Sequence, residues 1–201
     1  MIVFKNTQDS IPYKKFKYFY NKATENNQEN IEAVAISSYD PYLNEVDSRY
    51  VNLKYIIDDQ WIFFSNYNSN KSFQFNKHPN ISSLFFWNSI DIQIRIKAFV
   101  QKVSDDISDR HFQSRDIKKN ALAISSSQSK KILNYEKVLK NYNKTFNDIK
   151  SKTNPKRPKY WGGYQFTPYV FEFWEGQESR INKREIYELK KNKWVSYFLE
   201  P

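Results

Sequence analysis

The 201-residue chain contains no cysteine, three glycines, one methionine and two histidines. Without cysteine it has no disulfides and no thiolate ligands, and with only His78 and His111 we expect no metal site. The absence of cysteine is typical of a reducing compartment, and we expect a cytoplasmic protein. No apolar run approaches the roughly 18 residues of a membrane span, and residues 1–10 lack the apolar stretch of a signal peptide. We therefore expect no membrane association.

The three glycines, Gly162, Gly163 and Gly176, lie within one short stretch of the chain. Glycine is favoured where the backbone takes positive φ or lies close against another group. Because glycine is absent from the rest of the chain, its clustering here indicates unusual backbone requirements in this stretch.

Arginine is also scarce, since most of the 32 basic residues are lysine. In such a chain an arginine indicates a site that needs a planar, bidentate group, such as a phosphate, carboxylate or aromatic ring site. A surface ion pair is the alternative for any single one of them. The candidates are Arg49, Arg95, Arg115, Arg180 and Arg184.

The formal net charge is +10, and the densest basic tract runs from residue 150 to residue 159, within an expected basic loop at 147–160. Two prolines in this tract favour an exposed loop over a recognition helix. The other lysines are scattered, which favours a solvated surface with a few anion sites over a continuous nucleic-acid groove.

The composition, 39% hydrophobic and 18% aromatic, suffices for one sizeable core, and no linker divides the chain. We expect a single domain over residues 1–201, with an N-terminal helical arm at 1–30. Helical patterns occur at 13–24, 71–77, 107–113 and 130–146. The helix after Ser69 could present its first amides and Lys71 to an anion, although Ser69 could equally serve only as an N-cap.

Residues 92–100 carry an apolar side chain at every even position, the pattern of a strand with one buried face. Gln93 and Arg95 then point together away from the core. Seven or eight strands at this spacing predict a mainly β fold with flanking helices, of the α+β class, built on an antiparallel barrel. The other expected strands are 33–37, 51–57, 61–65, 81–87, 169–174, 186–189 and 194–199.

No glycine-rich phosphate loop, zinc-protease motif, nucleophile elbow or Cys-x-x-Cys motif is present. From the residue chemistry alone, the chain is an anion-binding, aromatic-rich β-barrel.

A set of short motifs, in order across most of the chain, resembles the pyridoxamine 5'-phosphate oxidases, flavin enzymes of the FMN-binding split-barrel fold. The resemblance implies an antiparallel split β-barrel of Greek-key type, and a homodimer that binds FMN between its subunits. The motifs are Arg49-Tyr-Val-Asn-Leu-Lys54, Phe64-Ser-Asn66, Ser69-Asn-Lys71, Leu84-Phe-Phe-Trp87, Gln93-Ile-Arg95, Phe112-Gln-Ser-Arg115, Ser127-Gln-Ser129, Trp161-Gly-Gly-Tyr164, Glu172-Phe-Trp174-Glu-Gly176, Arg180-Ile-Asn-Lys-Arg184 and Leu199-Glu-Pro201.

The resemblance also implies a set of FMN-binding residues. Cations and short polar side chains suit the phosphate and ribityl tail, whereas aromatic, amide and guanidinium groups suit the flavin ring. The implied cofactor-binding residues are Arg49, Val51, Lys54, Phe64, Ser65, Lys71, Gln93, Gln128, Ser129, Trp174 and Arg184.

By the same resemblance the chain oxidises pyridoxine or pyridoxamine 5'-phosphate to pyridoxal 5'-phosphate, with O2 as acceptor. Lys54 and Arg115 would bind the substrate phosphate, and Arg180 would lie over the reacting centre together with Asn182. His111 and Lys119 occupy positions where the family has a phosphate-binding tyrosine and a serine, and both remain hydrogen-bond donors.

Several further positions depart from the family pattern. Asn182 replaces a histidine that lies near the reacting carbon, and asparagine cannot titrate near neutrality. Asn70 replaces an arginine of the FMN phosphate site, Asp116 replaces a proline, and no arginine precedes Arg49. Two alternatives stay open: a flavin oxidase with another anionic ring substrate, as in the related phenazine-pathway oxidases, or a binding protein, either a flavin-binding protein without B6 oxidase activity or a basic nucleic-acid binder.

Overall fold

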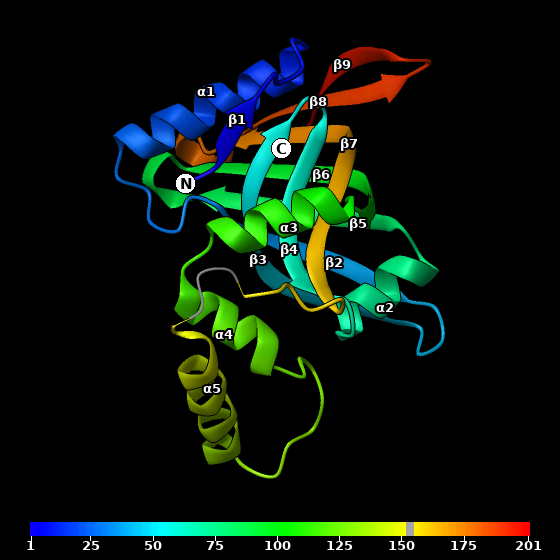
Figure 1. Cartoon of the computed structure of the whole chain (residues 1–201). Coiled ribbons are helices and arrows are strands. Elements are labelled where there is room, and N and C mark those ends of the chain that lie inside the picture. The colour runs from blue at the N-terminus through cyan, green and yellow to red at the C-terminus, as the bar shows by residue number, and fades with distance from the viewer. Residues whose placement is uncertain (152–154) are drawn as a thin grey trace.

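A computed structural model describes residues 1–151 and 155–201, and within them the strands form one continuous sheet (Figure 1). Six strands close into a barrel in the order β3-β2-β5-β6-β7-β4, because β4 pairs with both β3 and β7. The strands are β1 (Val3–Lys5), β2 (Ala33–Asp40), β3 (Glu45–Ile57), β4 (Gln60–Asn66), β5 (Asn80–Trp87), β6 (Ile92–Lys102), β7 (Trp161–Glu175), β8 (Lys183–Lys190) and β9 (Lys193–Leu199).

The barrel is antiparallel and has Greek-key topology, as expected. Strands β2, β3 and β4 follow one another as hairpin neighbours, and β5 returns through a helix to pair with β2. One pairing differs, since β1 runs parallel to β3 at the edge of the sheet. Three residues are too few to show a strand pattern, and β1 was therefore not predicted.

Strand β6 confirms the alternation seen in the sequence. Ile92, Ile94 and Ile96 are buried in the barrel, whereas Arg95 and Lys97 are exposed on its outer face. Strand β7 begins eight residues before the predicted start at residue 169. Glycines and Pro168 conceal its N-terminal half in the sequence. In the structure, Lys97 pairs with Val170 and Ala98 with Pro168, so Tyr169 is an extra residue of β7 beside this proline.

The helices are α1 (Ile11–Glu25), α2 (Asn70–Lys77), α3 (Asp105–Ser114), α4 (Ile117–Ser125) and α5 (Tyr135–Ile149). Helix α4 was not predicted, and the last predicted helix starts five residues too early. Asp116 caps α4 by accepting from Lys118 N, and Asn134 caps α5 by accepting from Lys137 N, so each cap sets the helix start. Within the described residues, no helix is long and apolar enough to cross a membrane.

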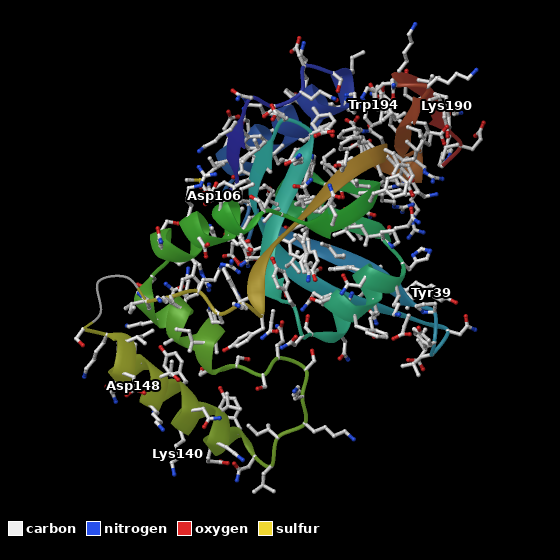
Figure 2. All side chains as sticks on the ribbon, turned by 45° about the vertical axis from the view of Figure 1, so that its right-hand side comes forward. Tyr39, Asp106, Lys140, Asp148, Lys190 and Trp194 are labelled. Carbon is white, nitrogen blue, oxygen red and sulfur yellow. The ribbon has the colours of Figure 1, made fainter. Side chains whose placement is uncertain are left out.

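Aromatic rings fill the barrel, and α1 packs across one end of it (Figure 1). Phe16 of α1 lies 4.4 Å from Trp61 and 5.2 Å from Phe85, measured between ring centroids. Helices α4 and α5 lie at the other end, and Figure 2 shows Lys140 and Asp148 of α5 well away from the strands. One end is thus covered by aromatic packing, and at α4 a smaller apolar cluster forms from Phe112, Ala123 and Trp161.

The glycines serve close approach and not positive φ. All three have ordinary φ, and a Cβ atom on Gly163 would lie 2.5 Å from Val103 Cγ2 and 3.0 Å from Phe64 Cε1. Left-handed backbone falls instead mainly to asparagine and aspartate, among them Asn192 in the β8–β9 turn. The glycine stretch is therefore a place where strands and side chains pack tightly.

Candidate active site

A cavity of about 610 Å³ opens where β3 and β4 separate. The two strands pair only from Leu53 to Ile57 of β3, and beyond this point β3 continues beside β2 while β4 continues beside β7. The lining contains five cationic side chains and one carboxylate, so the cavity suits anions. The lining residues are Asp47, Ser48, Arg49, Tyr50, Val51, Asn52, Lys54, Phe64, Ser65, Asn70, Lys71, His111, Arg115, Lys119, Gln128, Ser129 and Trp161.

Lys71 is the buried cation of this cavity, with 8% of its surface exposed. Its Nζ atom donates to Ser65 Oγ at 3.1 Å, Ser69 Oγ at 3.1 Å and Gln128 Oε1 at 3.2 Å, and no carboxylate in the described part of the chain pairs with it. Burial, followed by the charge of Arg49, lowers its pKa from 10.5 to about 8. A buried ammonium with neutral partners indicates that an external anion completes the site.

Lys71 also lies in the first turn of α2. Ser69 has N-cap geometry, but its side chain forms no capping bond; its hydroxyl donates to Asn66 O at 2.8 Å instead. The amide N–H groups of Asn70 and Lys71 have no acceptor among the described residues. First-turn amides that need an acceptor attract anions, and they do so here beside the Lys71 ammonium.

Arg49 lies beside this first cation and is held by its neighbours. Its guanidinium donates to Ser38 Oγ at 2.5 Å and Gln74 Oε1 at 3.2 Å, and it lies 3.6 Å from Asp47 Oδ2. Burial lowers the pKa of Arg49 while the nearby Asp47 carboxylate opposes this effect. The network fixes Arg49 in one orientation at the cavity wall.

A second group of cations, Lys54, Arg115 and Lys119, lines the same cavity. Arg115 donates to Lys119 O at 3.2 Å and lies over the Trp161 ring at 4.4 Å, yet its Nη1 is buried without a partner among the described residues. Lys54 is paired with Glu32 at 3.4 Å. The unsatisfied Arg115 nitrogen indicates a second anion site.

His111 lies among these cations and stacks on Phe64. The ring centroids are 3.7 Å apart with an interplanar angle of 12°, and Trp161 lies nearly parallel to both rings. Tyr55 Oη lies 2.8 Å from His111 Nδ1. The sequence does not predict Tyr55 and Trp161 as site residues; Trp161 belongs to the motif Trp161-Gly-Gly-Tyr164, whereas nothing local marks Tyr55.

The environment keeps His111 neutral. Burial, then the charges of Arg115, Lys54 and Lys119, lower the pKa of His111 from 6.5 to about 4. At neutral pH the imidazole therefore offers one N–H donor and one bare nitrogen.

The expected cofactor and substrate residues fall into two groups. Eleven of them line the cavity, whereas five that were expected with them do not. Gln93, Trp174 and Arg184 are direct neighbours in one row across β6, β7 and β8, on the outer face of the sheet. Arg184 donates to Glu172 Oε1 at 2.9 Å and to Glu200 O at 3.1 Å.

The other two, Arg180 and Asn182, lie on the connection between β7 and β8. Ser179 and Arg180 both take left-handed backbone, with φ of 58° and 60°. Asn182 Oδ1 accepts from Gln177 N at 3.2 Å and so closes this turn. Asn182 thus has a structural contact, and Arg180 is exposed at the surface.

Part of the basic loop also has a structural role. Arg157 donates to Asp105, Asp109 and the Trp161 carbonyl at 2.6 Å each, which joins the loop to α3 and the start of β7. Residues 152–154 of the predicted loop lie outside the described residues.

Comparisons with known proteins identify the family of the chain. The family model "Pyridoxamine 5'-phosphate oxidase" matches residues 21–143, and the model "Pyridoxine 5'-phosphate oxidase C-terminal dimerisation region" matches residues 161–201. A pyridoxine/pyridoxamine 5'-phosphate oxidase of Vesicomyosocius okutanii is 35% identical over 193 residues, covering 96% of this chain and 90% of that protein. One from Legionella pneumophila (strain Lens) is 33% identical over 190 residues, covering 94% and 87%.

Two solved structures share the fold. PhzG from Burkholderia lata 383, in complex with tetrahydrophenazine-1-carboxylic acid, has a TM-score of 0.88 at 21% identity, covering 97% of this chain and 100% of that one. A pyridoxamine 5'-phosphate oxidase-related, FMN-binding protein from Nostoc punctiforme has a TM-score of 0.76 at 12% identity, covering 96% and 99%. The expected split barrel is confirmed.

Proposed function

The chain belongs to the pyridoxamine 5'-phosphate oxidase family, and from this premise we propose that it oxidises pyridoxine or pyridoxamine 5'-phosphate to pyridoxal 5'-phosphate with O2 as acceptor. Its class is that of an FMN-dependent oxidoreductase. The observation that carries the substrate proposal is a cavity with two separate cation groups, one around Lys71 and one around Arg115. Such a cavity can bind two phosphate groups at once.

The residues at the Lys71 end fit the phosphate of FMN. The buried ammonium has only neutral partners, and the two first-turn amides of α2 are free to donate. We assign the phosphate and ribityl tail to Arg49, Ser65, Lys71, Gln128 and Ser129. Charged hydrogen bonds of this kind contribute about 1.5–3 kcal/mol each, which is why Lys71 dominates the assignment.

The residues at the other end fit the substrate phosphate. Arg115 has a buried, unpartnered nitrogen, and Lys54 and Lys119 add charge. His111 adds a neutral donor. Together they favour a doubly charged phosphate monoester over a singly charged carboxylate, because the attraction grows with the charge of the bound group.

Binding of the flavin ring requires the predicted residues that lie outside the cavity, on the outer face of the sheet. We propose that Gln93, Trp174 and Arg184 of one subunit meet Val51 and Phe64 in the cavity of the other. The match to a dimerisation region at residues 161–201 supports a homodimer. The same outer face carries exposed apolar side chains, including Phe86 and Leu199, in one row with Gln93, Trp174 and Arg184.

In the reaction, bound FMN supplies the hydride acceptor, which O2 then reoxidises. The chain's own groups would bind and orient the substrate: Arg115, Lys54 and Lys119 would fix its phosphate, and Arg180, which lies outside the cavity of its own subunit, would reach the reacting carbon from the other subunit. Asn182 holds the turn that carries Arg180 and can donate a hydrogen bond, but it cannot take up a proton.

The direct test is turnover. FMN-loaded protein is incubated with pyridoxine or pyridoxamine 5'-phosphate under oxygen, and pyridoxal 5'-phosphate and peroxide are measured. We expect both products with either substrate. Absence of both, in protein that holds stoichiometric FMN, rejects the proposed substrate.

A mixing experiment tests the shared site. Lys71→Met impairs the cavity of a subunit and Arg184→Ala impairs its outer-face group, so at an FMN concentration near the wild-type Kd both sites of each homodimer are defective. After the two variants are mixed and reassociated, heterodimers contain one intact site, and about a quarter of wild-type activity returns. If each site is built from a single chain, no activity returns.

A second function is supported by the departures at Lys119 and Asn182, which lie among the residues assigned to substrate. It is an FMN-dependent oxidation of another anionic ring compound. The fold shared with PhzG is compatible with it but does not argue for it. Slow turnover of B6 phosphates that is unchanged in Asn182→His, together with faster turnover of another ring acid, would favour this function.

A further inference from the structure

The hydroxyl of Tyr55 contacts the ring of His111 at its Nδ1 edge. The Tyr55 hydroxyl lies 2.8 Å from Nδ1, and the two rings meet edge to face with centroids 5.4 Å apart. Tyr55 does not line the main cavity. It lines a neighbouring cavity of about 400 Å³, with Lys5, Ile57, Ile107 and Arg110, and His111 forms part of the wall of both.

His111 is therefore fixed in two ways. The face of its ring is held by Phe64, with centroids 3.7 Å apart, and the Nδ1 edge is held by Tyr55. Its Nε2 atom has no hydrogen-bond partner among the described residues, and His111 lines the main cavity together with Lys54, Arg115 and Lys119. A neutral histidine fixed in this way presents a single ring nitrogen to whatever binds in that cavity.

The proton positions follow from what each neighbour can do. An anion held by Lys54, Arg115 and Lys119 only accepts hydrogen bonds, so His111 contacts it favourably only through Nε2–H. A neutral imidazole with hydrogen on Nε2 has a bare Nδ1, which needs a donor. The Tyr55 hydroxyl can rotate to donate to it.

We propose that Tyr55 is a positioning residue which, by donating to Nδ1, holds His111 in the Nε2–H form so that the neutral ring donates to the phosphate of the substrate. The inference rests on the proposed function, because it assumes an anionic substrate at the Arg115 end of the cavity. It adds a residue that binds nothing directly and acts through its neighbour.

The chain supplies a matched control at its other histidine. Tyr39 meets His78 edge to face with centroids 5.6 Å apart, but its hydroxyl bonds to Asn44. His78 Nδ1 lies 3.3 Å from the Asn80 carbonyl, which can only accept. Figure 2 shows Tyr39 at the far side of the barrel from α5. His78 is therefore expected with hydrogen on Nδ1, the opposite of His111.

Nitrogen-15 spectra of the ring nitrogens test the proposal without turnover. With two histidines, His78→Gln assigns the signals. In the FMN-loaded protein near neutral pH we expect His111 as the Nε2–H form and His78 as the Nδ1–H form. Tyr55→Phe should mix the two forms of His111, whereas Tyr39→Phe should change neither histidine. A charged or Nδ1–H His111 in the wild type, or one unaffected by Tyr55→Phe, overturns the proposal.

Binding and kinetics complete the test. Inorganic phosphate should perturb the Nε2–H signal of the wild type, and Tyr55→Phe should weaken phosphate binding and raise KM for pyridoxamine 5'-phosphate roughly fivefold with kcat nearly unchanged. A merely structural role for Tyr55 would lower kcat or FMN content instead and overturns the proposal. If phosphate perturbs His111 but no B6 phosphate turns over, the proposed substrate fails while the Tyr55 role stands.

Discussion

The Nζ atom of Lys71 lies 3.1 Å from Oγ of Ser65, which joins the first turn of α2 to the end of β4. Both residues line the cavity that opens where β3 and β4 separate, so the buried cation lies where the sheet opens. A cation buried among neutral partners is costly unless a bound anion offsets its desolvation. This relationship carries the assignment of the FMN phosphate.

Replacing Lys71 tests that assignment. We expect Lys71→Met to raise the Kd for FMN by about 10- to 100-fold, the loss of one charged hydrogen bond of about 1.5–3 kcal/mol. The measurement is quenching of flavin fluorescence on binding. The control is Lys77→Met, at the exposed end of the same helix, which should leave the Kd within about twofold. Equal effects of the two substitutions would contradict the assignment.

The lowered pKa of Lys71 also predicts how FMN binding depends on pH. Without an anion, Lys71 loses its proton as the pH rises through about 8, and an anion favours the charged form, so binding takes up a proton. The Kd should rise about tenfold per pH unit above pH 8, while the FMN phosphate stays doubly charged. If the Kd for FMN of the wild type depends on pH between 7 and 9.5 as little as that of Lys71→Met, this prediction is wrong.

The same shift has a consequence for stability, with a definite sign. Between pH 8 and 10.5 the unfolded chain binds the Lys71 proton and the folded chain does not, so this residue makes the unfolding free energy rise with pH in that window. Comparison of urea midpoints of the wild type and Lys71→Met without FMN isolates its share. As the pH rises from 8 to 10.5, the unfolding free energy of the wild type should increase relative to that of Lys71→Met.

Asn182 should matter through the turn that it closes. Asn182→Ala removes the acceptor for Gln177 N, so we expect amide exchange at Gln177 to accelerate about fivefold and kcat/KM to fall while the Kd for FMN stays unchanged. Asn182→Asp keeps an acceptor and should preserve slow exchange. If Asp and Ala variants exchange equally fast, the hydrogen bond does not hold the turn.

Gly163 should tolerate no side chain. A Cβ atom there would lie 2.5 Å from Val103 Cγ2, so we expect Gly163→Ala to lower the unfolding free energy by about 1–3 kcal/mol. Val103→Ala removes the clashing methyl groups. In a double-mutant cycle followed by urea unfolding, the two changes together should cost less than their sum by about 1 kcal/mol or more. If the two losses in unfolding free energy simply add, contact with Val103 is not what excludes a side chain at Gly163.

The sequence predicted the barrel because alternation survives wherever one face of a strand is buried, as in β6. It did not predict α4, whose nine residues depend on a cap at Asp116 and on packing against α5. It also left open how the glycines are used. Close approach is decided by neighbours such as Val103, which are distant in sequence, whereas left-handed positions went to asparagine.

The site was predicted in part. The resemblance identified Lys71, Arg115 and Gln128, and the structure brings them to one cavity. It could not show the contact between Tyr55 and His111, which are 56 residues apart and meet only because α3 packs beside the barrel. Trp174 was expected with them, but a single chain leaves it on the outer face of the sheet.

Five cations around one carboxylate give the cavity a field that reaches into solvent over about 8 Å at physiological ionic strength. Anionic nucleotides are drawn along this field, so their association rate should fall as salt is added. The same charges repel one another across the cavity walls. Binding of an anionic nucleotide therefore also reduces this repulsion. We expect the protein to resist thermal unfolding and proteolysis best when the nucleotide is bound.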